Sequence, residues 1–179
     1  AVECSEEYEA YVYVTGMHLL PEYGNTYLQI SEEGHKNVYV EKALELTPKM
    51  DINIGNTILC LAQYVAKIHP DVIIVHGDRI DALAGAIVGI LNNILVAHIE
   101  GGEVTGTVDD SLRHAITKLS HLHFTANEET RQRLLQLGEK DDSIQIIGSP
   151  DIDIMLSEKL PSIKDIKKKY KIPFREYAI

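Results

Sequence analysis

The sequence predicts an α/β fold with a doubly wound, mostly parallel sheet of the Rossmann-like type. Short runs of β-branched residues alternate along the chain with longer segments in which apolar residues recur every three or four positions. This alternation is typical of β-α-β units and of a parallel sheet. With 179 residues, 45% of them hydrophobic, the chain is long enough for one well-buried domain and too short for two full ones.

Six short runs are predicted to be strands. The runs that begin at Val72 and Ile94 are apolar throughout, as expected for strands covered by helices on both faces. We therefore place these two near the centre of the sheet. In chain order, the predicted strands are residues 11–15, 37–40, 72–76, 94–98, 121–125 and 143–147.

Six segments between the strands have helical spacing of their apolar residues. They are residues 23–32, 53–69, 79–92, 109–119, 128–137 and 151–157. The charge run at 164–169 is interpreted as a solvated helix end. No internal repeat or low-complexity segment interrupts this order.

The ends of the chain shape the predicted domain organisation. Residues 1–160 are predicted to form a Rossmann-like domain, and residues 161–179 a linker and the start of a second domain. The chain begins without Met, and we interpret its first residues as the second half of a polar helix. Residues 177–179 resemble the start of another strand. Because a doubly wound sheet normally holds its first strand in the middle, we expect missing sequence at both ends and an unfilled position in the sheet.

The charge and the cysteine content exclude several classes of protein. A formal net charge of −10 opposes binding to nucleic acid or to an anionic membrane. The two cysteines, Cys4 and Cys60, make no disulfide framework, and no Cys or His spacing indicates zinc. No apolar run approaches the roughly 18 to 20 residues that span a bilayer, and the acidic start does not resemble a signal peptide. We expect a soluble, cytoplasmic protein without a metal.

Three acidic residues follow elements of the predicted sheet. Asp78 and Glu100 each come soon after an apolar strand, and Asp109 opens the next helical pattern. Because the carboxyl ends of parallel strands meet at one edge of a sheet, we expect the three carboxylates to converge in one crevice. Several carboxylates in one crevice push one another's pKa values apart, so that one can act as an acid beside another acting as a base.

Structural roles compete with these assignments. Asp78 would serve as a helix cap, and of the pair Asp109 and Asp110 we assign the cap to Asp110 and the chemistry to Asp109. Arg113 is equally well explained as a salt-bridge partner one turn further along the helix. The strand-end histidines His76 and His98 more readily satisfy backbone groups than act in catalysis.

Four motifs in order resemble a known family. They are Thr15-Gly16-Met17-His18 with Tyr23-Gly24-Asn25-Thr26, His76-Gly77-Asp78-Arg79 with Asp81-Ala82-Leu83-Ala84, His98-Ile99-Glu100-Gly101-Gly102-Glu103, and the stretch from Gly106 to Leu119. Each motif alone is weak, but their order and separations make the resemblance specific. The segment from Val14 to Asp153 resembles the hydrolysing UDP-N-acetylglucosamine 2-epimerases, which include bacterial sialic-acid pathway enzymes and the epimerase half of an animal bifunctional enzyme.

The resemblance implies the first of two facing Rossmann-like domains in a GT-B-type architecture, with a UDP-sugar in the cleft and no cofactor. It implies conversion of UDP-N-acetylglucosamine and water to N-acetylmannosamine and UDP, for sialic or related nonulosonic acid synthesis. Carried over by motif, Asp78, Glu100 and Asp109 are the catalytic carboxylates. The predicted substrate-binding residues are Arg79, Arg113, Gly101, Gly102, Glu103 and His98.

The family pattern also includes an Arg-bearing loop upstream and a nucleotide site in the second domain, and this chain has neither. We therefore expect the chain alone to be inactive and the intact protein to be an active homo-oligomer. One alternative is an epimerase-like enzyme that acts on a UDP- or GDP-diacetamido-trideoxyhexose in the legionaminic acid branch. A second is a GT-B glycosyltransferase, which would not explain the three acids, and a third is a catalytically silent nucleotide-binding or scaffolding domain.

Overall fold

The computed structural model describes residues 5–43, 46–157 and 160–174. Within these residues the chain divides into two compact units, the first ending at Ile147 and the second beginning at Gly148. Cys4 and the predicted strand start at 177–179 lie outside the described residues. The domain boundary that we predicted at residue 160 belongs to a longer two-domain architecture and stays a prediction.

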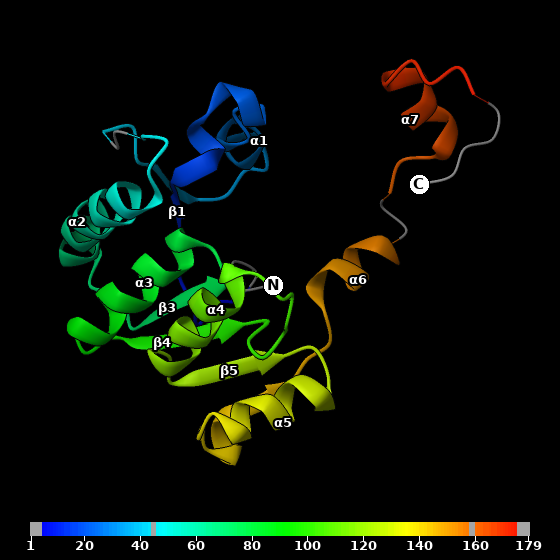
Figure 1. The fold of residues 1–179 in the computed structure, drawn as a ribbon. Helices are drawn as coiled ribbons and strands as arrows, with labels where there is room; N and C mark the ends of the chain where they lie inside the picture. Colours follow the sequence, from blue (N-terminus) through cyan, green and yellow to red (C-terminus); the bar gives the residue numbers. More distant parts are fainter. Residues whose placement is uncertain (1–4, 44–45, 158–159, 175–179) are drawn as a thin grey trace. The chain divides into compact units, whose positions relative to one another are not determined.

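The first unit contains all six predicted strands (Figure 1). They form two parallel sheets in the described part of the chain, one of two strands in the order β1-β2 and one of four in the order β3-β4-β5-β6. The strands are β1 (Tyr11–Val14), β2 (Asn37–Val40), β3 (Val72–His76), β4 (Leu95–Ile99), β5 (Leu122–Thr125) and β6 (Ile144–Ile146). The parallel pairing and the alternation with helices agree with the predicted fold class.

The position of β3 corrects one prediction. We placed both β3 and β4 near the centre of the sheet, but β3 is an edge strand of the four-stranded sheet, and of these two strands only β4 is interior. Among the described residues no strand pairs with the outer side of β3, because β1 pairs only with β2. The side chain of Ile74 on β3 is accordingly 59% exposed, whereas Val96 on β4 is fully buried.

Seven α-helices are present in the described residues, one more than we predicted as separate helices. They are α1 (Tyr27–Glu32), α2 (Met50–Ile68), α3 (Ile80–Leu91), α4 (Val108–Lys118), α5 (Glu128–Gln136), α6 (Pro150–Met155) and α7 (Ile163–Lys169). The charge run that we interpreted as a helix end lies within α7. Tyr23, the first residue of our first predicted helix, instead ends a separate short 3-10 helix, Pro21–Tyr23, and α1 begins at Tyr27.

Helix α3 organises the core of the first unit. It packs on β3 and β4 and lies between α2 and α4 (Figure 1). On one side, Val75, Val96 and Ile116 form a buried cluster with Ala86 of α3. On the other side, Val88 of α3 packs against two buried residues of α2. This apolar packing fixes the start of α3, and the turn before it, relative to the carboxyl ends of the strands.

Candidate active site

A cavity of about 650 Å³ lies at the carboxyl ends of β1 and β3. In open α/β sheets this is the end at which ligands bind, because the loops that follow the strands gather there. The walls come from the segment after β1, from residues 46–53, from the turn between β3 and α3, and from the first turns of α4. They are formed by Gly16, Met17, Leu20, Glu22, Tyr23, Leu46, Thr47, Pro48, Met50, Asn53, Asp78, Arg79, Ile80, Asp81, Asp109 and Leu112.

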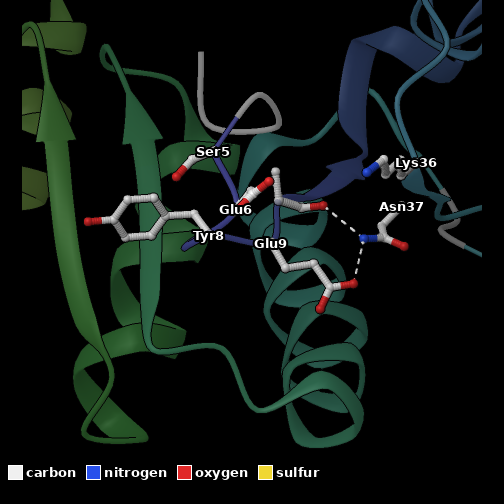
Figure 2. Close-up of a pocket in the computed structure, with 7 residues that line it drawn as sticks. Ser5, Glu6, Tyr8, Glu9, Lys36 and Asn37 are labelled. Carbon is white, nitrogen blue, oxygen red and sulfur yellow. Dashed lines mark hydrogen bonds between the residues drawn. The ribbon is translucent and has the colours of Figure 1, made fainter.

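A second pocket, of about 500 Å³, lies at the amino ends of β1 and β2 (Figure 2). Asn37 spans one side of it, and its amide nitrogen donates to Glu9 Oε1 and to the carbonyl of Ala10, each at 3.1 Å. These bonds tie the segment before β1 to the start of β2. Because this pocket lies at the end of the strands opposite to the usual ligand site, the first cavity is the candidate active site.

The turn from β3 to α3 places Asp78 and Arg79 in the cavity wall. Gly77 has φ +73°, which a residue with a side chain rarely adopts, and it lets the chain turn sharply after β3. Helix α3 has Arg79 as its N-cap and no side-chain capping bond, so Asp78 does not act as the helix cap that we considered. The Arg79 guanidinium instead contacts the sulfur of Met17 across the cavity wall.

The carboxylate of Asp78 pairs with Arg113 of α4. Arg113 is only 4% exposed, and its guanidinium also donates to Asp110 Oδ1 at 2.9 Å and to the carbonyl of Glu103 at 2.8 Å. With these acceptors inside the protein, Arg113 holds the β3–α3 turn against α4. The geometry therefore gives Arg113 a structural role, and the substrate contact that the resemblance implies for it stays a prediction.

The two aspartates that open α4 have different surroundings. The N-cap is Thr107, whose hydroxyl accepts from the backbone nitrogen of Asp109, so Asp110 is not the cap that we assigned. A Thr directly before the first helical residue was the available sequence signal. Asp110 instead organises the preceding loop: its carboxylate accepts from the backbone nitrogens of Thr105 and Gly106, each at 2.8 Å. These bonds, led by the one from Thr105, lower the Asp110 pKa to about 2.

Asp109 lies in the wall of the cavity, on the same helical turn. Its carboxylate accepts a hydrogen bond from the Thr107 hydroxyl at 3.0 Å. The structure thus separates an Asp that faces the cavity from an Asp that is fully engaged with its own loop. The cap role that we assigned to Asp110 is therefore wrong, because its partners lie in the preceding loop, and the chemical role that we assigned to Asp109 stays a prediction.

Asp81 is a cavity residue that we did not include among the predicted site residues. It lies in the first turn of α3, three positions after Asp78, and burial raises the pKa of its carboxyl group. Gly16, with φ +61°, lies directly against it, since a Cβ on Gly16 would be 2.6 Å from Asp81 Oδ2. A side chain here would be strained and would displace the Asp81 carboxylate, and this close approach brings the segment after β1 to the start of α3.

Glu100 follows β4 and is placed differently from Asp78 and Asp109. It has the left-handed backbone value φ +64°, and its nitrogen donates to the carbonyl of Phe124 at 2.8 Å. One carboxylate oxygen, Oε2, lies 2.8 Å from His76 Nε2. Glu100 does not line the cavity. The structure therefore brings two of the three predicted carboxylates into one cavity and places the third at the end of the neighbouring strand.

His98 and the two glycines after Glu100 are held by contacts within the protein. His98 is fully buried, and Nε2 donates to the carbonyl of Gly77 at 2.8 Å, which confirms our interpretation of this histidine as a strand-end backbone partner. A Cβ on Gly101 would lie 3.1 Å from His98 Nδ1, and one on Gly102, with φ +86°, would lie 2.5 Å from the carbonyl oxygen of Thr130. Packing therefore requires a glycine at Gly102 and leaves little space for a side chain at Gly101, and the predicted contact of both with substrate stays a prediction.

No cluster of three or more His, Cys, Asp or Glu side chains with the geometry to hold a metal ion occurs in the described part of the chain. Over the same residues, none of the helices combines the length and the apolar character needed to cross a bilayer.

Comparison with known proteins gives close relatives. The family described as UDP-N-acetylglucosamine 2-epimerase matches residues 1–179. The chain is 46% identical over 178 residues to UDP-N-acetylglucosamine 2-epimerase of Neisseria meningitidis, covering 99% of this chain and 47% of that protein. It is 40% identical over 165 residues to a hydrolysing UDP-N,N'-diacetylbacillosamine 2-epimerase of Legionella pneumophila, covering 90% of this chain and 44% of that protein. The chain thus spans less than half the length of these relatives.

A solved structure of similar fold is that of a Neisseria meningitidis UDP-GlcNAc 2-epimerase bound to UDP-GlcNAc. The TM-score is 0.78 at 24% identity, covering 95% of this chain and 47% of that one. The likeness confirms the predicted α/β fold and its relation to GT-B-type proteins.

Proposed function

This chain belongs to the UDP-N-acetylglucosamine 2-epimerase family, and from this premise we propose that it is the acid-bearing domain of a hydrolysing epimerase. The proposed reaction converts UDP-N-acetylglucosamine and water to N-acetylmannosamine and UDP. The observation that supports it most directly is the cavity at the carboxyl ends of the strands, where Asp78, Arg79 and Asp109 lie together. A role in sialic or related nonulosonic acid synthesis and a cytoplasmic location are parts of the same proposal.

The proposed chemistry has two stages, each with a proton transfer. In the elimination, the bond between C1 and the UDP oxygen breaks, its electron pair leaves with UDP, and a base removes the proton from C2. In the hydration, the hydroxyl group of water adds to C1 and a proton returns to C2 on the opposite face of the acetamidoglucal. Carboxylates serve both stages, since they move protons and stabilise positive charge that develops at C1.

The surroundings of the three carboxylates support different roles for them. Asp78 is paired with the buried Arg113, which holds its carboxylate in the cavity wall, and we assign to it the stabilisation of positive charge on the sugar ring. Asp109 lies in the cavity wall, where its carboxylate accepts from the Thr107 hydroxyl at 3.0 Å, and the Glu100 carboxylate lies 2.8 Å from His76 Nε2 at the end of the neighbouring strand. We assign the proton transfers to these two.

The leaving UDP carries negative charge that needs a cation. Arg79 is the one arginine or lysine in the described cavity wall, and we propose that it contacts a phosphate. Arg113 is committed to Asp78 and Asp110. The remaining phosphate contacts would come from parts of the complete protein that correspond to the longer relatives, and on this ground we expect the 179-residue chain alone to be inactive.

The proposal is tested with the complete protein in D2O, followed by proton NMR. Release of UDP together with N-acetylmannosamine deuterated at C2 supports it, and an unchanged spectrum of UDP-N-acetylglucosamine rejects it. Asp78→Asn and Asp109→Asn should each reduce turnover by about 100-fold or more, in line with the usual contribution of acid-base and electrostatic groups. Asp142→Asn, an exposed change outside the cavity, is the matched control and should leave turnover unchanged.

A second substrate deserves the same assay, because relatives at 40% and 36% identity are named diacetylbacillosamine 2-epimerases. A higher kcat/KM with UDP- or GDP-N,N'-diacetylbacillosamine than with UDP-N-acetylglucosamine would assign the enzyme to that branch. A glycosyltransferase would instead consume the nucleotide sugar only when an acceptor is added. Light scattering of the complete protein would test the homo-oligomer that we also propose.

A further inference from the structure

We propose that His76 is a positioning residue that orients the carboxylate of Glu100 for the reaction. The inference rests on the proposed function, because it gives a purpose to His76 only if Glu100 transfers a proton. His76 is the last residue of β3, and Glu100 directly follows β4. In the parallel register of the two strands His76 pairs with Ile99, so Glu100 lies one position beyond its partner.

Three contacts join these strand ends. The backbone nitrogen of Gly77 donates to the carbonyl of Ile99 at 3.0 Å, and His98 Nε2 donates back to the carbonyl of Gly77 at 2.8 Å. The third contact is that between His76 Nε2 and Glu100 Oε2, at 2.8 Å. The first two fix the backbone of both turns, and the third fixes the direction of a side chain.

The backbone at Glu100 makes such a contact useful. A non-glycine residue with φ +64° keeps this conformation only where its surroundings hold it, and such residues concentrate at functional sites. Here the surroundings are the bond to Phe124 and the packed Gly101 and Gly102. The backbone is therefore held in place, while the long side chain of Glu100 has several rotamers, and the contact with His76 favours one of those that bring Oε2 to Nε2.

The two strand-end histidines are suited to different tasks. His98 is fully buried and has both ring nitrogens within hydrogen-bond distance of protein groups, Thr117 and Gly77. The His76 side chain is 49% exposed and that of Glu100 is 23% exposed. The His76–Glu100 contact thus lies at the solvent-facing rim of the strand ends, where a substrate can reach the carboxylate. With His76 Nε2–H donating to Oε2, the direction of the Glu100 carboxylate is defined for proton transfer with the substrate.

The test compares donors at position 76 in the complete protein. His76→Gln keeps an N–H donor at similar reach, whereas His76→Asn is shorter and His76→Phe keeps the ring volume without a donor. We expect kcat to fall by about tenfold or more in the Asn and Phe variants. We expect His76→Gln to stay within about threefold of the parent, and KM to change less than kcat in all three. His35→Gln is the matched control, since His35 forms an exposed contact with Glu33 at 3.1 Å.

A structural readout completes the test. A long-range proton-nitrogen NMR spectrum of the parent should show the His76 proton on Nε2, and Glu100→Ala should abolish this preference. Thermal melting of each variant identifies any that fails to fold, in which case the Gln and Asn pair alone decides. An active parent whose Asn and Phe variants keep parental kcat, or whose His76 carries its proton on Nδ1, overturns this inference and leaves the proposed function standing. A parent that does not convert the nucleotide sugar overturns both.

Discussion

Arg113, buried on α4, donates through its guanidinium to Asp78, which lies in the turn after β3. The contact joins two elements that are far apart in the sequence, and the same guanidinium holds Asp110 within its own helix. One buried cation thereby fixes the position of a cavity carboxylate relative to the helix that carries Asp109. The shape of the cavity wall depends on this bridge.

Arg113→Met is therefore expected to destabilise the protein. Removing Arg113 leaves the Asp78 and Asp110 carboxylates without their cation. The free energy of unfolding should fall by up to about 3 kcal/mol, and not by more, because both carboxylates retain some contact with water. Arg131→Met, which removes surface pairs with Glu128 and Asp141, should cost less than about 1 kcal/mol. Urea unfolding measures both, and equal losses would contradict the structural role of Arg113.

Asp109→Asn should lower turnover, whereas Asp110→Asn should lower the melting temperature. Asp109 lies in the cavity wall, so its amide variant should lose turnover by about 100-fold while its melting temperature stays that of the parent. Asp110 accepts bonds from the loop at Thr105 and Gly106, so its amide variant should melt at a lower temperature. Kinetics and thermal melting of the two variants side by side provide the check. If Asp110→Asn lost turnover without any loss of stability, the division between the two residues would be wrong.

Gly102→Ala should be more destabilising than Gly138→Ala. Both glycines have nearly the same backbone, with φ +86° and +88°, so the left-handed conformation costs each alanine about 1 kcal/mol. A Cβ at Gly102 also meets the Thr130 carbonyl at 2.5 Å, whereas one at Gly138 meets nothing within 4 Å. The clash adds about 1–3 kcal/mol at Gly102 alone. Urea unfolding of the two variants isolates this difference, and similar losses would show that α5 yields to the added methyl group.

The sequence predicts the local elements well because their signals are local. The strand at Val72–His76 is found with its predicted bounds, and α5 differs only at its carboxyl end. Apolar periodicity and the position of acids after strands carry this information. The position of β3 at a sheet edge was not predictable in this way, since the run of apolar residues is the same in an edge strand and a central one.

The parts of the site that the sequence did not predict depend on contacts between residues that are distant in the chain. Asp78 with Arg113 and His76 with Glu100 join separate elements, and no spacing in the sequence specifies either pair. Asp81 was missed for a related reason, because its place in the cavity depends on the approach of Gly16 from the segment after β1. The residue types at the strand ends predict that a site exists there, while the side-chain pairing depends on the folded chain.

The buried histidines should make the protein less stable in mild acid. Burial lowers the pKa of His98 to about 4, from an ordinary value of 6.5, and burial also lowers that of His123. Because the folded pKa is depressed, the unfolded chain binds protons more readily between these values. The stabilising contribution of His98 is complete above pH 6.5 and is lost as the pH falls towards 4. From pH 7 to pH 5 we expect His98 to account for a loss of about 2 kcal/mol in the free energy of unfolding.

His98→Gln separates this effect from general acid denaturation. Its amide can still donate to the Gly77 carbonyl but does not take up a proton in this range, so the slope of stability against pH should become shallower. His35→Gln changes a histidine in an exposed contact and should keep the parental slope. Urea unfolding at pH 7, 6 and 5 gives the three slopes. A parental slope in His98→Gln would mean that His98 takes up its proton in the folded protein without cost, in conflict with its complete burial and its donation to Gly77.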